Sequence, residues 1–283
     1  MIGIVFKKNG QNFWVNFDNE KNVLVKSRGK VKQTTHIFIG DYVEVVKIND
    51  EYIIERILER KNCINRPAIA NVDVLMIIQS VKEPDLSIHL LNTYLAFYEN
   101  KSISNVCIFL TKIDLLTKKE KEKLDLILAD YAKESYMFFS YEEKDFARFN
   151  KVFDKNLVCF AGQSGVGKST IINKILPNSN IFTQEISKSL NRGKHTTTTS
   201  TLLEYKDGYV ADTPGFSSVT LDMNKFQYSQ AYNLYRELST KCKYSNCLHI
   251  NERDCFIIKQ FELDKICKLK YLDYLETIKK LPN

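Results

Sequence analysis

Apolar and polar residues alternate through residues 1–62, which is typical of strands that bury one face. The alternation is clear in "FWVNF" at 13–17 and "NVLVKS" at 22–27, and the stretch 40–58 reads as two strands joined by an Asn-Asp turn. Several short strands in succession predict a small barrel over 1–64, of the oligonucleotide-binding (OB) type. Three aromatic residues of this barrel either stack on nucleic-acid bases or fill its core: Phe13, Trp14 and Phe17.

The pattern changes after Pro67. An almost continuous apolar run, Val72–Gln79, predicts a buried parallel strand, and Leu and Tyr residues then recur at helical spacing. The elements expected next are a strand at 105–111, a charged helix at 118–133, and strands at 135–140 and 157–162. This alternation predicts an α/β domain over 65–220, with a mostly parallel sheet covered by helices on both faces.

The stretch "GQSGVGKS" at 162–169 matches the phosphate-loop pattern in full, between a predicted strand and a predicted helix. Its glycines let backbone N–H groups surround the phosphates, while Lys168 meets the β- and γ-phosphate oxygens and Ser169 holds Mg²⁺. We expect nucleotide contacts from the whole loop, comprising Gly162, Gln163, Ser164, Gly165, Val166, Gly167, Lys168, Ser169 and Thr170.

Two later segments predict the remaining contacts to Mg²⁺ and the γ-phosphate. An Asp-Gly pair at 207–208 indicates a hairpin whose second strand leads into "ADTPG". Asp212 is expected to hold Mg²⁺ there, and Gly215 to offer its N–H to the γ-phosphate. The polar, basic stretch 187–200 predicts a switch loop, in which one threonine contacts Mg²⁺: Thr197, with Thr196 as the near alternative.

The stretch "TKID" at 111–114 predicts recognition of guanine. Asp114 can accept hydrogen bonds from both N1–H and N2–H₂ of guanine, a pair that adenine does not offer, and Lys112 would lie along the base and ribose. Thr111 occupies the first position of this motif, at which GTPases usually have Asn. Ser140, at the end of the next strand, is expected to contact the base through its backbone.

The five parts of a GTPase site are therefore present, in the order base, base, phosphate, switch, switch. Such a site is assembled from loop tips at one edge of a sheet, so it does not record where the chain begins. The order predicts a circularly permuted P-loop GTPase domain.

Four residues near the C-terminus have metal-ligand spacing: Cys242, Cys247, His249 and Cys255. Three thiolates and one imidazole suit a tetrahedral, structural Zn²⁺ site. They belong to a predicted helical zinc-binding domain over 221–283, whose tail carries an apolar stripe at Leu263, Ile266, Leu269, Leu272 and Leu275.

The net charge of +7 gathers at the two ends of the chain, because residues 1–62 and 221–283 each carry 11 Lys and Arg against 8 Asp and Glu. This suits a phosphate-rich partner such as RNA, and it is also compatible with an ordinary solvated surface. Neither a secretory signal nor a membrane-spanning run is evident, so we expect a cytoplasmic protein. Nothing in the sequence suggests a dimer interface, and a monomer is expected.

Together these features resemble the circularly permuted GTPases of small-ribosomal-subunit biogenesis called RsgA, also YjeQ or YloQ. The resemblance extends from the barrel through "TKID", "GQSGVGKS", "RGKHTTT" and "DTPGF" to the zinc-binding tail. It implies an enzyme that hydrolyses GTP to GDP late in maturation of the small subunit, is stimulated by that subunit, and couples hydrolysis to release from rRNA.

Phe216 occupies the position at which Ras-like enzymes have a water-orienting glutamine. The resemblance implies that His195 acts instead, with Lys168 and Gly215 at the γ-phosphate; a role for His195 as an RNA contact stays open. Two other functions also stay open. One is an RNA-binding scaffold with a structural nucleotide, and the other is an ATP-dependent kinase or ATPase, against which "TKID" argues.

Overall fold

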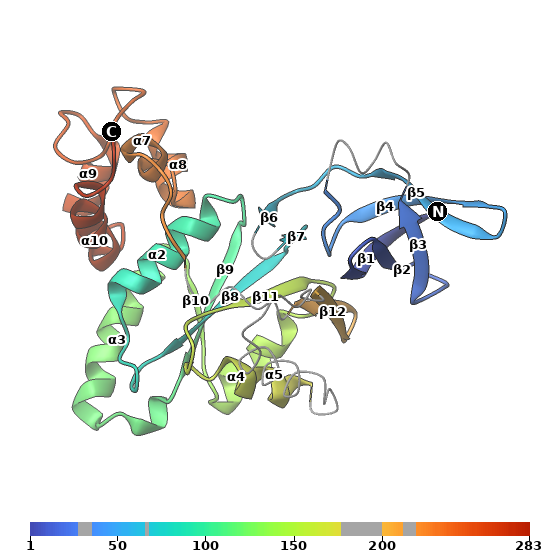
Figure 1. Cartoon of the computed structure of the whole chain (residues 1–283). Coiled ribbons are helices and arrows are strands. Elements are labelled where there is room, and N and C mark those ends of the chain that lie inside the picture. The colour runs from blue at the N-terminus through green and yellow to red at the C-terminus, as the bar shows by residue number, and fades with distance from the viewer. Residues whose placement is uncertain (28–35, 66–67, 177–199, 212–218) are drawn as a thin grey trace. The chain divides into compact units, whose positions relative to one another are not determined.

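A computed structural model describes residues 1–27, 36–65, 68–176, 200–211 and 219–283 (Figure 1). These residues form two compact units. The first contains the described parts of 1–74, 150–160 and 168–216, and the second those of 75–149, 161–167 and 217–283. None of the helices in the described ranges is both long enough and apolar enough to cross a membrane.

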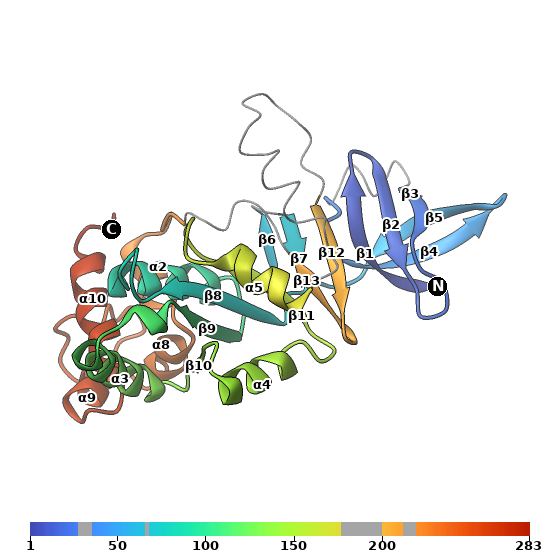
Figure 2. The same ribbon diagram turned by 90° about the horizontal axis from the view of Figure 1, so that it is seen from below.

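The first unit begins with a closed barrel. Its strands are β1 (Ile2–Asn9), β2 (Asn12–Asn16), β3 (Val23–Ser27), β4 (Tyr42–Ile48) and β5 (Glu51–Ile57). They pair in the order β1-β2-β3-β5-β4, and β1 also pairs with β4, which closes the barrel (Figure 2). A five-stranded closed barrel of this kind is OB-like, as the alternating pattern predicts.

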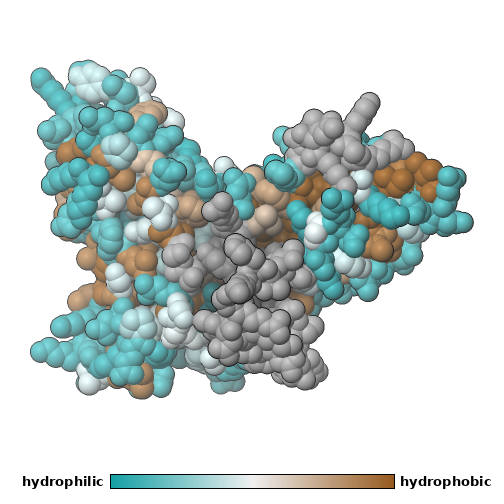
Figure 3. Space-filling model, viewed as in Figure 1, coloured by the Kyte–Doolittle hydropathy of each residue, from teal (hydrophilic) through white to brown (hydrophobic). Residues whose placement is uncertain are grey.

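Two of the three aromatic residues, Phe13 and Phe17, fill the core of the barrel. Phe13 and Phe17 are 5% and 8% exposed and belong to the apolar core of the barrel. Trp14 lies on the opposite face of β2, half-buried, with the ammonium of Lys7 5.0 Å from its ring centroid. Figure 3 shows apolar patches on the surface of the described residues. In β3, Leu24 is an exposed apolar residue.

The rest of the first unit places the strand that enters the phosphate loop beside a hairpin. Its elements are β6 (Cys63–Asn65), β7 (Ala68–Ala70), β11 (Leu157–Ala161), α5 (Lys168–Ile175), β12 (Ser200–Tyr205) and β13 (Gly208–Ala211). The hairpin of β12 and β13 lies where the Asp-Gly pair predicts one, although its two-residue turn is Lys206–Asp207 and Gly208 pairs with Tyr205. β13 runs parallel to β11, with Ala211 opposite Cys159.

The second unit contains a parallel sheet with strand order β10-β9-β8, followed along the chain by the C-terminal helices. Its first elements are β8 (Val74–Ser80), α2 (Ile88–Glu99), β9 (Asn105–Thr111), the 3₁₀ helix η1 (Ile113–Leu115), α3 (Lys118–Ala132), β10 (Met137–Phe139) and α4 (Glu143–Lys151). The C-terminal helices are α7 (Lys225–Ser229), α8 (Asn233–Ser239), α9 (Phe256–Glu262) and α10 (Lys268–Ile278). Every residue of β8 is buried, as its apolar run predicts, and α10 packs on α2 and α3 (Figure 1).

The apolar stripe predicted for the C-terminal tail is wrong in part. Leu263 and Leu272 are 52% and 51% exposed, whereas α10 buries Tyr271, Tyr274 and Ile278. The reason is that α9 ends at Glu262 and a new helix begins six residues later, so no single helical face runs through the tail.

Candidate functional site

The phosphate loop, residues 162–167, needs its glycines for conformation. Gly162, Gly165 and Gly167 have φ angles of +149°, +81° and +90°, in the region that side chains rarely adopt. A Cβ on Gly162 would also lie 2.5 Å from the carbonyl oxygen of Ile78. Lys168 opens α5 directly after the loop. The chain therefore provides a glycine loop followed by a helix N-terminus, the arrangement that binds phosphates.

A side-chain hydrogen bond joins the "TKID" turn, which is predicted to read the base, to the phosphate loop. The hydroxyl of Thr111, at the end of β9, donates to the carbonyl oxygen of Val166 at 2.7 Å. Thr111 is 2% exposed, and a Cβ on Gly167 would lie 3.5 Å from its methyl group. The residue that stands where Asn is usual thus fixes the position of one loop against the other.

Lys112 and Asp114 share the tight turn that follows. Lys112 adopts the left-handed conformation at φ 60° and donates through its ammonium to the carbonyl oxygen of Glu83. Asp114 lies in η1 and is exposed, so its carboxylate is accessible to a ligand. The turn therefore presents an acceptor with two oxygens next to the phosphate loop to which Thr111 is bonded.

A hydrogen-bonded cap holds the far side of this turn. Thr117 caps α3, accepting from the N–H of Glu120, and the Glu120 carboxylate accepts from the N–H of Thr117 at 2.7 Å. Lys82 donates to the same carboxylate at 2.9 Å, and this ammonium with the Thr117 donors lowers the pKa of Glu120 to about 2. Sequence reasoning missed this cap, although the spacing Thr-x-x-Glu before a helix is its usual signal.

Ser140 lies in the turn after β10, where it was predicted. It is 5% exposed, and its hydroxyl donates to Asp145 at 2.9 Å and accepts from the N–H of Glu142 at 3.2 Å. Because β9 and β10 are parallel and paired, their carboxyl ends reach the same edge of the sheet. Ser140 and the "TKID" turn therefore belong to one edge, as a base-binding site requires.

The switch residues cannot be placed in this way. His195, Thr197 and its alternative Thr196, as well as Asp212, Gly215 and Phe216, lie outside the described residues. What the structure describes is the strand before Asp212, namely β13, which ends at Ala211 in parallel register with β11. The two strands that lead into the phosphate loop and into "DTPGF" therefore run side by side.

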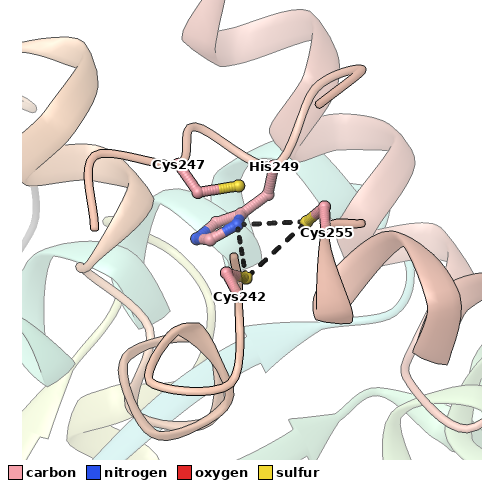
Figure 4. A group of neighbouring side chains, drawn as sticks. All are labelled: Cys242, Cys247, His249 and Cys255. Atoms are coloured by element: carbon pink, nitrogen blue, oxygen red, sulfur yellow. Dashed lines mark hydrogen bonds between the residues drawn. The ribbon is translucent and has the colours of Figure 1, made fainter. Parts of the chain in front are cut away.

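The four predicted metal ligands come together in one group (Figure 4). Their ligand atoms all lie within 4.8 Å of one another. The Sγ atoms of Cys242 and Cys255 are 3.9 Å apart, and Nδ1 of His249 lies 3.8 Å and 3.4 Å from them. Tetrahedral zinc with Zn–S bonds of about 2.3 Å places its sulfurs about 3.8 Å apart, so the spacing fits this ion.

Nδ1 of His249 faces the sulfur atoms, so it is the nitrogen placed to bind a metal. Burial lowers the pKa of His249 to about 4, which keeps the imidazole in the neutral form that binds metals. Its Nε2 is buried and has no hydrogen-bond partner among the described residues. The loop is fixed by Glu252, which accepts from three backbone N–H groups, and by the hydroxyl of Tyr271, which donates to the carbonyl of His249 at 2.9 Å.

This combination of sites matches known proteins. The sequence model of the RsgA GTPase family matches residues 57–222, more than half of the chain. The chain belongs to the RsgA GTPase family. It is thus a GTP-hydrolysing enzyme, and the assignment that "TKID" and "GQSGVGKS" predict is confirmed.

Individual relatives match over most of the chain. The small ribosomal subunit biogenesis GTPase RsgA of Malacoplasma penetrans is 47% identical over 257 residues, which are 90% of this chain and 90% of that protein. The protein of the same name from Ureaplasma urealyticum is 43% identical over 87% of this chain and 82% of its own length. The crystal structure of YloQ, a circularly permuted GTPase, is 29% identical, covers 99% of this chain and 94% of YloQ, and has a TM-score of 0.80. The circular permutation predicted from the order of motifs is therefore confirmed.

Proposed function

We propose that this protein acts in biogenesis of the small ribosomal subunit, as a cytoplasmic monomer whose GTPase is stimulated by that subunit. Hydrolysis of GTP would then release the protein from rRNA. The observation that carries the proposal is the match, over most of the chain, to proteins named for this function. The hydrogen bond that joins the "TKID" turn to the phosphate loop supports the proposed GTPase activity.

Within this site the residues divide by the part of the nucleotide that they bind. Asp114 accepts from N1–H and N2–H₂ of guanine, Lys112 lies along the base, and the backbone of Ser140 closes the base site. The N–H groups of 162–167 and the first turn of α5 surround the phosphates. Thr111 holds the two loops in register through its bond to Val166.

A Mg²⁺ ion bound with GTP would be held by Ser169, Thr197 and Asp212. When bound, this ion neutralises charge on the β- and γ-phosphates. The chain's own contribution is positioning: Lys168 contacts the phosphate oxygens, and the N–H of Gly215 meets the γ-phosphate. These assignments follow from the motif positions in the sequence.

Phe216 has no group that orients water, so intrinsic hydrolysis should be slow. We assign this role to His195, which would orient the attacking water once docking on the subunit fixes its loop, without accepting a proton. Arg192 and Lys194, close to His195 in the sequence, would contact RNA. The subunit would then stimulate hydrolysis by positioning a residue of this chain, and it would not have to supply a catalytic group of its own.

The Cys₃His group would bind one structural Zn²⁺. All four protein ligands are present, which leaves no open position of the kind found in catalytic zinc sites. The barrel and the C-terminal segment, which share the chain's excess of basic residues, would supply the contacts to rRNA.

The test is GTP hydrolysis with and without purified small subunits, for the wild type and for Lys168→Ala and His195→Ala. We expect strong stimulation in the wild type and none in Lys168→Ala. The His195→Ala protein should bind subunits and keep its slow basal rate but lose the stimulation.

Tight binding of subunits with no change in rate would contradict the proposal and favour an RNA-binding scaffold. Competition of bound GTP by ATP as effective as by GDP would instead contradict guanine recognition and favour an ATP-dependent enzyme. Retention of full stimulation by His195→Ala would leave the histidine as an RNA contact.

A further inference from the structure

One lysine of the C-terminal segment is completely buried. Lys270, on α10, has 0% exposure, and its ammonium forms an ion pair with Glu134, whose side chain is 1% exposed. The same ammonium donates to the hydroxyl of Tyr136 at 3.1 Å. Lysine is almost never fully buried unless it is paired, and Glu134 is the partner here.

Aromatic rings enclose the buried ammonium. It lies 4.4 Å, 4.8 Å and 5.1 Å from the ring centroids of Tyr232, Tyr235 and Tyr136. Removing such a pair from water is costly, and an apolar side chain of similar volume often gives an equally stable fold. In some proteins, a buried pair of this kind instead fixes one arrangement of the groups around it.

The arrangement extends to α2 through a second buried carboxyl group. Tyr136 donates to Glu99 at 2.7 Å, and the backbone N–H of Asn233 donates to the other oxygen of Glu99 at 2.5 Å. Glu99 is 2% exposed; burial raises its pKa, and nearby Lys270 opposes that shift. A chain of contacts therefore links α10, the connection between α3 and β10, the end of α2 and the start of α8.

The anchored connection leads to both base-reading positions. Glu134 and Tyr136 lie between α3 and β10; α3 begins four residues after Asp114, and β10 ends immediately before Ser140. Asp130, in the last turn of α3, also accepts a 2.8 Å hydrogen bond from the first turn of α10. With its 15 residues, α3 is a rigid rod about 22 Å long, so a shift of its end is passed on to its beginning.

We propose that Lys270 is a positioning residue for guanine recognition, which fixes the connection between α3 and β10 and thereby the placement of Asp114 and Ser140. The inference rests on the proposed role of Asp114 as the acceptor of guanine. On this proposal, α10 influences base recognition indirectly, through the connection between α3 and β10, and Lys270 itself makes no contact with the nucleotide.

The experiment compares the affinities of GDP and IDP by calorimetry. IDP lacks the 2-amino group that Asp114 would bind, so the ratio of the two affinities reports on placement of the carboxylate and is unchanged when part of the sample is merely unfolded. The variants are Lys270→Met, which keeps length without charge, and Lys270→Met with Glu134→Gln, which also removes the unpaired buried carboxylate. Lys268→Met is the matched control, because Lys268 is exposed on the same helix. Asp114→Ala tests the base site itself.

We expect the preference for GDP over IDP to fall roughly tenfold in both Lys270 variants and to stay unchanged in Lys268→Met, since hydrogen bonds to charged groups contribute about that factor. An unchanged preference in folded, metal-containing Lys270 variants, with a lost preference in Asp114→Ala, would overturn this inference alone. An unchanged preference in Asp114→Ala would instead overturn the proposed base site. Failure of both Lys270 variants to fold would assign the lysine to stability and equally overturn the inference.

Discussion

Thr111 and Val166 are 55 positions apart in the chain, and a hydrogen bond of 2.7 Å joins the hydroxyl of the first to the carbonyl oxygen of the second. This bond connects the "TKID" turn with the phosphate loop. The two loops are far apart in the sequence, so a tertiary contact has to connect them. Thr111 makes it with a single hydroxyl.

Replacing Thr111 by Val should weaken binding of guanine nucleotides. The change keeps the shape of the side chain but leaves the buried carbonyl of Val166 without its donor, at a cost of about 1–3 kcal/mol. We expect roughly tenfold weaker binding of GDP by calorimetry, within the range which that cost allows. Thr111→Ser keeps the hydroxyl and is the control; equal affinities in the Val and Ser variants would show that the bond does not hold the site.

The cap at the start of α3 predicts a pH-dependent contribution to stability. Because the pKa of Glu120 is about 2 in the folded protein and about 4.3 in an unfolded chain, its carboxylate stabilises the fold above pH 4.3. That contribution is lost as the pH falls from about 4.3 toward 2.

Glu120→Gln should therefore unfold at lower urea than the wild type at pH 7, and the difference should narrow below about pH 4.3. Glu122→Gln, an exposed change on the same helix, should match the wild type throughout. A difference between Glu120→Gln and the wild type that is as large near pH 3 as at pH 7 would rule out the carboxylate as its source.

The outer face of the barrel predicts an RNA contact at Trp14. Stacking of one base on an aromatic side chain contributes about 1–3 kcal/mol, so Trp14→Ala should weaken binding of single-stranded rRNA fragments by roughly five- to 150-fold. Trp14→Ala should destabilise the protein less than a core change does, because Trp14 is not part of the apolar core of the barrel. Phe13→Ala is the contrasting variant, since loss of a core ring costs about 3–5 kcal/mol and should unfold the barrel. Wild-type RNA affinity in Trp14→Ala would exclude Trp14 as a stacking residue.

The Cys/His group predicts a stoichiometric metal. The purified protein should contain one zinc per chain, and Cys255→Ser should lose it and melt at a lower temperature, because binding of a structural zinc contributes to folding. Cys63→Ser, outside the group, should retain the metal. Zinc content is measured by mass spectrometry. Zinc-free wild-type protein, together with an unchanged melting temperature in Cys255→Ser, would contradict the zinc site.

Much of the site was predictable because its parts are local in the sequence. The phosphate loop, the "TKID" turn and the metal ligands each lie within a short stretch with fixed spacing, and strand alternation placed the barrel. The alternation did not assign Phe13, Trp14 and Phe17 individually. The folded barrel shows that Phe13, in β2, and Phe17, directly after it, belong to the core.

The interior of the C-terminal segment was not predictable, because its partners are far apart. Lys270 reads as a surface residue in any local pattern, yet it pairs with Glu134, 136 positions away. The tyrosines of the C-terminal helices likewise pack ring against ring, as Tyr228 and Tyr235 do on Tyr274. Leu272 is more hydrophobic than Lys270, and a sequence pattern would bury Leu272 first, yet Leu272 is exposed and Lys270 is buried.

In the proposed function, hydrolysis of GTP lowers the affinity of this protein for the small subunit. The most direct measurement is co-sedimentation with purified small subunits in the presence of either a non-hydrolysable GTP analogue or GDP. We expect the protein to stay bound with the analogue and to be released with GDP. Equal binding in the two states would contradict it.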